Sequence, residues 1–243
     1  MPSTTETGTA KRVANFEDLI SFCTSYGATY NPSKQNLKLS ALNTLRANAK
    51  AAVQAVKTAK TNYDNACNTR EIAFKQLKPL ATKVIYALTI TDATEQTLAD
   101  AKTTNNKIQG RRAKKIQQAE ATTPEETPTP KKTISVSQQS FDSQVDSFAQ
   151  LVTILSAEPT YTPNESKLTL AGLNTYLTDL LAKNTAVVEA ATALSNARIA
   201  RDQIIYHETT GLVTIAQEVK LYIKSLYGNN SAQDKQMRSL KFS

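Results

Sequence analysis

Apolar and small residues recur at helical spacing along the first half of the chain. In alternate steps of three and four residues from Leu42, the positions read Leu, Leu, Ala, Ala, Val, Ala, Tyr, Ala, Arg, Ala, Leu, Leu, Val and Ala, as far as Ala87. Only Arg70 departs from the pattern, so the spacing predicts a helical seam that packs against neighbouring helices. Because many positions are alanine, the seam favours closely packed antiparallel bundles and long helical hairpins.

The second half carries a similar seam, and each long helix has a point where it should bend. We expect the first to bend or end at Pro79, whose ring clashes with the preceding turn, and the second beside Gly211. The second seam, which Lys183 interrupts, runs through Leu173, Tyr176, Leu180, Val187, Ala190, Leu194, Ala197, Arg201 and Ile204.

The two halves repeat one another in sequence. YNP followed after four residues by LKLSALNTL (residues 30–45) recurs 131 residues later as YTP and LTLAGLNTY (residues 161–176). Upstream, NFEDLISFC (residues 15–23) matches SFAQLVTIL (residues 147–155) once one residue is inserted. These matches predict a tandem duplication.

The sequence therefore predicts an all-α protein of two tandemly duplicated, elongated helical bundles with long coiled-coil-like helices. Proline and threonine dominate residues 122–133, a composition typical of linkers. The expected organisation is a disordered, Thr-rich tail (residues 1–14), a first bundle (15–121), the linker (122–133) and a second bundle (134–243).

Short motifs should fix the helix ends. The motif from Asp92 to Glu95 has the spacing of a capping box and predicts a helix running towards Ala121. We expect Tyr30 and Tyr161 to pack against the start of each long helix, the alternative being a role in surface recognition.

Two further positions repeat between the halves. Asn43-Thr44 and Asn174-Thr175 lie beside core leucines, where we expect a shared hydrogen bond between helices. Arg70 and Arg201 occupy equivalent seam positions, and each is followed by an acid. A buried polar residue can fix helix register, but we favour an arginine whose stem packs while its head reaches water.

Composition argues against most catalytic and cofactor chemistry. The chain has one histidine, two cysteines, no tryptophan and six isolated glycines. Zinc clusters and paired Glu-x-x-His motifs need more ligands than these, and isolated glycines form no phosphate-binding loop. His207, beside Glu208, is the one candidate general base, and a polar residue near a helix bend is the favoured interpretation. We therefore expect no enzyme, cofactor, metal site or small-molecule substrate.

The cysteines and the absence of long apolar runs bear on the compartment. No run approaches the roughly 18 to 20 residues of a membrane span, and the N-terminus lacks the apolar core of a secretory signal. We expect a cytoplasmic protein with reduced cysteines. Cys23 and Cys67 fall on or beside apolar stripes, where a free cysteine behaves as a small hydrophobic residue.

A basic stretch is the strongest functional lead. The chain has a net charge of +8, and its first half carries the excess. A basic stripe suits the phosphates of nucleic acid or an anionic membrane, although no aromatic residue is interleaved to stack on bases. Nucleic acid stays an open alternative, a membrane is disfavoured, and a solvated face or a protein contact is the simplest interpretation. The candidate contact residues are Lys102, Lys107, Arg111, Arg112, Lys114 and Lys115.

Several phrases resemble duplicated all-helical bacterial proteins to which no activity is assigned. They are the repeated LxLxxLN cores, KIQGRRAKK (residues 107–115), ISVSQQSF (134–141) and EVKLYIKSLYG (218–228). The resemblance implies a helical fold and supplies no site residues. With the long seam, it favours a non-enzymatic structural or scaffold protein that acts through helix–helix association, with a second copy or another helical protein as partner. The alternative is a nucleic-acid-binding accessory protein that uses the basic helix over residues 102–115.

Overall fold

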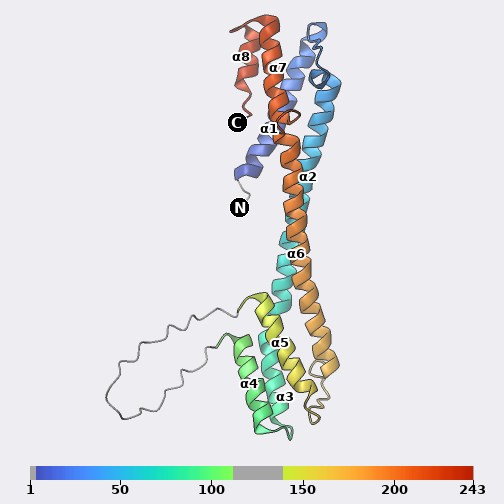
Figure 1. Ribbon diagram of the computed structural model, residues 1–243, viewed down its shortest axis with the longest axis vertical. Coiled ribbons are helices and arrows are strands. Elements are labelled where there is room, and N and C mark those ends of the chain that lie inside the picture. The colour runs from blue at the N-terminus through green and yellow to red at the C-terminus, as the bar shows by residue number, and fades with distance from the viewer. Residues whose placement is uncertain (1–3, 112–138, 243) are drawn as a thin grey trace, which may run out of the picture. The chain divides into compact units, whose positions relative to one another are not determined.

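The computed structural model describes residues 4–111 and 139–242, and no strand occurs in these two ranges. The predicted all-α class is therefore confirmed for the described part of the chain (Figure 1). The predicted linker, residues 122–133, lies outside the described residues. The helices are α1 (Thr4–Ser25), α2 (Leu39–Phe74), α3 (Leu77–Thr89), α4 (Glu95–Gln109), α5 (Phe141–Ser156), α6 (Leu170–Tyr206), α7 (Leu212–Tyr227) and α8 (Ala232–Ser239), with two 3-10 turns, η1 (Gly27–Thr29) and η2 (Gln35–Leu37).

The predicted seams face inward over their whole length. Every seam position in residues 42–87 and in residues 173–204 is buried or half-buried. The first long helix breaks at residues 75–76, just before Pro79. The proline ring explains this position, because it clashes with the carbonyl four residues earlier, which belongs to Lys75. The second long helix ends at Tyr206, and Gly211 is the N-cap of α7.

Helix α1 overturns the prediction of a disordered tail for residues 4–14. The helix begins at Thr4, although we expected a first helix only from about Phe16. Thr9 and Val13 are buried, and their spacing continues into Phe16 and Ile20 on the same helical face. Thr9 and Val13 therefore extend the packed face of α1 ahead of the expected start at Phe16.

Two compact units divide the chain differently from the predicted bundles. Unit 1 comprises Met1–Asn65 and Glu189–Ser243, and unit 2 comprises Ala66–Val188. Each unit therefore contains helices from both sequence halves, which we call the first half (residues 1–121) and the second half (residues 134–243). The predicted division into bundles 15–121 and 134–243 does not describe these units.

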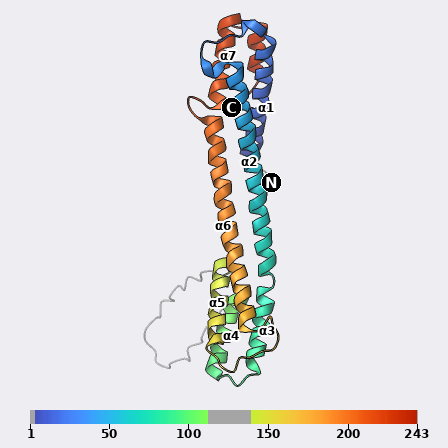
Figure 2. The same cartoon turned by 90° about the vertical axis from the view of Figure 1, so that its right-hand side faces the viewer.

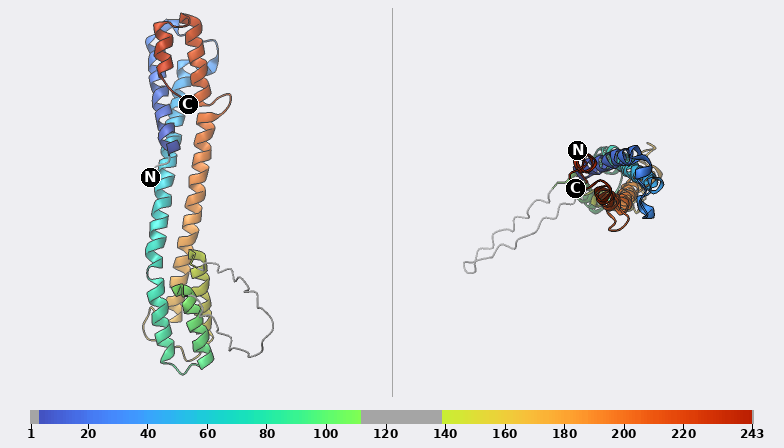
Figure 3. Two further views of the ribbon diagram at one scale, coloured as in Figure 1. Left: turned by 90° about the vertical axis from the view of Figure 1, so that its left-hand side faces the viewer. Right: turned by 90° about the horizontal axis from the view of Figure 1, so that it is seen from above.

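The core of unit 1 is built from α1, the first part of α2, the end of α6, α7 and α8. Figures 2 and 3 show α1 and α7 side by side, although they lie at opposite ends of the sequence. Their facing side chains are apolar and close-packed, which stabilises by roughly 1.5 to 3 kcal/mol for each large side chain buried. The fully buried members include Phe16, Leu19, Leu42, Ile205, Leu212 and Val219.

The core of unit 2 is built from the end of α2, then α3, α4, α5 and the first part of α6. Helix α4 packs beside both α3 and α5. The side chain of Thr94 caps α4 by accepting a hydrogen bond from the N–H of Thr97, so the predicted capping box at Asp92 is wrong by two residues. The fully buried members include Leu77, Leu88, Ile108, Phe148, Leu151, Leu155, Leu173 and Leu180.

The two units bury matching residues. In each unit, one half supplies its first helix and the start of its long helix, and the other half supplies its last two helices. Helix α1 thus corresponds to α5, α2 to α6, α3 to α7 and α4 to α8. The matching buried residues are Phe16 and Phe148, Leu19 and Leu151, Cys23 and Leu155, Leu42 and Leu173, Leu77 and Leu212, Ala81 and Ala216, Val84 and Val219, and Leu88 and Ile223.

The lengths of α2 and α6 explain why each unit mixes the two halves. These helices have 36 and 37 residues, whereas α1 has 22 and α7 has 16. At 1.5 Å per residue, the long helices extend well beyond the helices that cover their first turns. Each long helix therefore passes from one unit into the other, and the two short helices that follow it fold there.

Candidate interaction surfaces

In unit 1, aromatic pairs join the two halves. Edge-to-face and tilted ring contacts add to the area that such residues bury. Tyr30 also lies close to the loop contact in which the Tyr222 hydroxyl accepts a hydrogen bond from the backbone N–H of Asn31, at 3.3 Å. The ring centroids are 6.5 Å apart for Phe16 and Phe242, 5.4 Å for Tyr26 and Tyr227, and 5.4 Å for Tyr30 and Tyr222.

Side chains of α1 and α7 also hold the segment that follows α8. Lys220 Nζ donates to the carbonyl of Leu240 at 2.6 Å, and Asn15 Nδ2 to that of Lys241 at 2.6 Å. Arg12 Nε donates to the carbonyl of Phe242 at 3.0 Å. Burial, and then the charge of Lys241, lower the pKa of Lys220. Three consecutive carbonyls are thus bonded to two helices, one from each half.

In unit 2, the halves meet around Phe141. The guanidinium of Arg70 lies 4.0 Å from the centre of this ring, and the ring of Phe74 packs edge-on at 4.7 Å. The Tyr176 hydroxyl donates to the carbonyl of Ala73 at 2.7 Å. Gln139 Nε2 donates to the carbonyl of Lys107 at 2.9 Å, so the residue two positions before α5 lies directly against the end of α4.

The seam arginines correct one expectation. Arg201 is only 4% exposed, and its Nη2 lies 2.8 Å from Oδ1 of Asp202. Its head is buried, contrary to the favoured interpretation, and it pairs with the carboxylate of Asp202, whose own side chain is 47% exposed. Arg70 is half-buried, with its Nε buried and without a hydrogen-bond partner, and its charge rests on the Phe141 ring.

The two repeated tyrosines occupy the same place in each unit. Tyr30 donates its hydroxyl to the carbonyl of Leu37 at 2.7 Å, and Tyr161 to that of Leu168 at 2.9 Å. Both tyrosines are buried. Each therefore ties the loop to the residue two positions before the long helix begins, as the expected packing role requires.

The repeated asparagine and threonine pairs do not link helices. Asn43 Nδ2 donates to the carbonyl of Leu39, and Asn174 Nδ2 to that of Leu170, both at 2.9 Å and both within one helix. These positions are exposed, one step round the helix from the buried leucines. The expected bond between helices is therefore wrong, because the amides reach their own preceding turn.

Two large apolar side chains, one on α3 and one just after it, are exposed, which the sequence pattern alone did not indicate. Tyr86 is 69% exposed and Ile90 is 87% exposed, on the side opposite the buried leucines. With Pro79 and Lys83 they form one stripe at spacings of four, three and four residues, which we call the α3 face. This spacing is readable in the sequence, but the same apolar residues also fit a buried helix.

The basic stretch is only partly within the described residues. Lys102 and Lys107 lie on α4 and Arg111 follows it; Lys102 and Arg111 are exposed, and Lys107 is half-buried. Arg112, Lys114 and Lys115 lie outside the described residues. The helix does not continue as predicted, because Gly110 adopts a left-handed conformation (φ 76°) that ends it.

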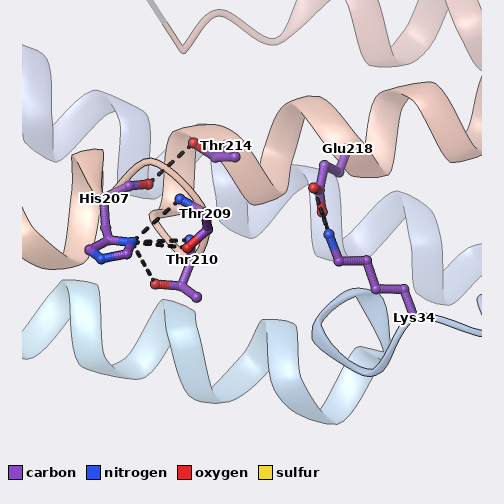
Figure 4. Close-up of polar contacts among 6 residues, drawn as sticks. All are labelled: Lys34, His207, Thr209, Thr210, Thr214 and Glu218. Atoms are coloured by element: carbon purple, nitrogen blue, oxygen red, sulfur yellow. Dashed lines mark hydrogen bonds and ion pairs between the residues drawn. The ribbon is translucent and has the colours of Figure 1, made fainter.

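His207 lies in the turn between α6 and α7 (Figure 4). Its Nδ1 accepts from the backbone N–H groups of Thr209 and Thr210, both at 3.4 Å, and lies 3.0 Å from the Thr210 hydroxyl. Thr214 donates to the His207 carbonyl at 3.3 Å. One ring nitrogen is thus occupied in shaping the turn. The nearby pair of Lys34 and Glu218, at 2.6 Å, ties the loop before α2 to α7.

The remaining candidate chemistry is sparse in the described part of the chain. Cys23 and Cys67 are free, and burial raises the pKa of the Cys23 thiol to about 12. Residues 4–111 and 139–242 contain no group of three or more histidine, cysteine or acidic side chains placed to hold a metal ion. Within the same ranges, no helix has the length and apolar character to cross a membrane.

Comparison with known proteins found no relative of this chain. No protein-family model, curated protein or solved structure matches the chain.

Proposed function

We propose that this protein is a non-enzymatic structural scaffold that works through helix–helix association and assembles with further copies of itself. The observation that carries the proposal is that both units are closed by helices from both halves. The fold thus depends on packing between helices of the first half and helices of the second half.

The proposal includes a tandem duplication of the chain. Within each pair of corresponding helices, residues at one offset are buried in matching places, although the offset changes from 132 to 131 to 135 along the chain, and the tyrosine bonds before α2 and α6 are the same. The inward-facing seams favour coiled-coil-like pairing of the long helices. We further propose that the chain is cytoplasmic and related to the duplicated helical bacterial proteins that its motifs resemble, with another helical protein as the alternative partner.

Light scattering over a range of protein concentrations tests this function. We expect the mass of the purified chain to rise from monomer to dimer or larger species as concentration increases. The same measurement after refolding from denaturant shows whether assembly forms when the chains fold together. A monomer under all of these conditions would contradict the proposal.

Nucleic-acid binding is the second candidate, and the exposure of Lys102 and Arg111, with the half-buried Lys107 between them, favours it. Lysine and arginine that neutralise phosphates give affinity that falls steeply with salt. We expect a mobility shift at low salt, and replacement of these three residues by alanine should weaken it. A matched control replaces Lys50 and Lys57, exposed lysines of α2, by alanine. Equal binding by the first variant and wild type would exclude α4 as the contact.

A further inference from the structure

Each half of the chain carries two sets of helices that need a partner. The first set is the first helix with the start of the long helix, and the second set is the last two helices. In unit 1, the first set of the first half packs on the second set of the second half, and in unit 2 these roles are reversed. Each half therefore supplies the packing partners for both sets of helices in the other half.

We infer that a second copy of this chain can supply the partner half, so that two chains form a dimer by exchanging halves. In this dimer, the first half of each chain packs on the second half of the other. This inference rests on the proposed self-association and names its surface. The surface is the one that Phe16 and Phe242 occupy in unit 1 and that Arg70 and Phe141 occupy in unit 2.

The exchanged dimer keeps the contacts of the monomer. The aromatic pairs, the bond from Tyr176 to Ala73 and the bonds that Arg12 and Asn15 donate to the carbonyls after α8 all join one half to the other. They form equally well whether the two halves belong to one chain or to two. The free energies of monomer and dimer then differ mainly in how the halves are brought together. In the monomer a covalent link joins them, whereas formation of the dimer depends on the concentration of chains.

The segment between α4 and α5 sets that difference. Residues 112–138 can span at most roughly 90 Å, which is long enough to connect two separate bodies. A covalent link of this length gives the two halves an effective concentration in roughly the millimolar range. Monomer is therefore favoured in dilute solution, and chains that refold together at high concentration should be trapped as dimers, because leaving the dimer requires full separation of the halves.

The α3 face is the competing surface for a dimer. Tyr86 and Ile90 are exposed within one half and make none of the contacts between halves. Replacing both by glutamate should abolish an association through this face and should leave an exchange of halves unchanged. The two modes therefore give opposite results with one variant.

Cleavage of the link tests the exchange in the full chain. A site-specific protease sequence replaces residues 124–129, outside the described contacts. The chain is refolded at low and high concentration, monomer and dimer are isolated, and each is cut and its mass measured. We expect the cut monomer to keep its full mass, because both units hold both halves. We expect the cut dimer to fall to monomer mass, because only the two links joined its bodies.

Each other outcome has a definite meaning. A dimer that survives cleavage, or that the Tyr86→Glu, Ile90→Glu variant cannot form, overturns the exchange and leaves self-association standing. A cut monomer that separates into half-length pieces also overturns the exchange, since the halves would then fold apart. A chain that forms no dimer at any concentration overturns both the exchange and the proposed function.

Discussion

At the scale of single residues, the two buried tyrosines before the long helices offer a matched pair. Tyr30→Phe and Tyr161→Phe each leave a backbone carbonyl without its hydroxyl donor. We expect each to lower the free energy of unfolding by about 1 to 2 kcal/mol, and the double variant to show the sum, because the sites lie in separate cores. Urea unfolding measures this. The exposed Tyr86→Phe is the control and should change nothing.

Two tyrosines, Tyr161 and Tyr176, should make stability fall at alkaline pH. Burial raises the pKa of Tyr161 and of Tyr176 to about 12, above their ordinary value of 10.0. The folded state then holds these protons where the unfolded chain releases them, so stability present below about pH 10 is lost as pH rises towards about 12. We expect Tyr161→Phe to flatten this decline. An unchanged slope of unfolding free energy against pH would argue against the assignment.

The two cysteines should differ in reactivity. Burial raises the pKa of the Cys23 thiol, which keeps it from forming the nucleophilic thiolate, whereas Cys67 is half-buried. We expect iodoacetamide to label Cys67 in the native protein and to label Cys23 only after unfolding. Peptide mass spectrometry locates the label. Fast labelling of Cys23 in the native state would contradict its burial.

Single residues also show what the sequence could not predict. The seam marks Arg201 as inward-facing, but the pattern does not say whether a long side chain ends in water or beside Asp202. Asn43 and Asn174 repeat between the halves, and their bonds to the preceding turn depend on local rotamers. Periodicity gives the direction of a side chain and leaves its terminal contacts open.

At the scale of an element, mutations in the buried face of α3 should destabilise the protein much more than mutations in its exposed face. Leu88→Ala removes a buried side chain and should cost about 2 to 5 kcal/mol of unfolding free energy. Replacing both Tyr86 and Ile90 by serine should change it by less than about 1 kcal/mol, because both are exposed. Chemical denaturation compares the variants. A large loss for the serine variant would mean that the α3 face is covered.

The elements themselves were largely predictable from the chain. The seams identified both long helices, because burial recurs with the helical period. The ends were less accurate: Thr94 caps α4 in place of Asp92, Gly110 ends it before Arg111, and α1 starts far ahead of Phe16. Capping depends on local geometry that several neighbouring polar residues satisfy equally well in sequence.

At the scale of the whole molecule, the packing of helices from one half on helices from the other half was not predictable from the pattern. A seam shows which face of a helix is buried, and it does not show which helix covers that face. The ambiguity is large because α3 and α7 bury similar residues, such as Leu77 and Leu212. The lengths of α2 and α6 relative to their neighbours account for which helices cover each buried face.

The link between the halves should be dispensable for folding. Gln139 bonds to the carbonyl of Lys107 and accepts from Lys78 Nζ at 3.1 Å, so the ends of α4 and α5 already meet. Deleting residues 122–133 roughly halves the loop and should raise the free energy of unfolding by about 0.5 kcal/mol through a smaller closure entropy. If the predicted bundles were independent, the deletion would leave stability unchanged and crowd them together. Because a shorter link also restricts exchange between chains, the deletion should lower the yield of dimer on refolding, which light scattering measures in the same samples.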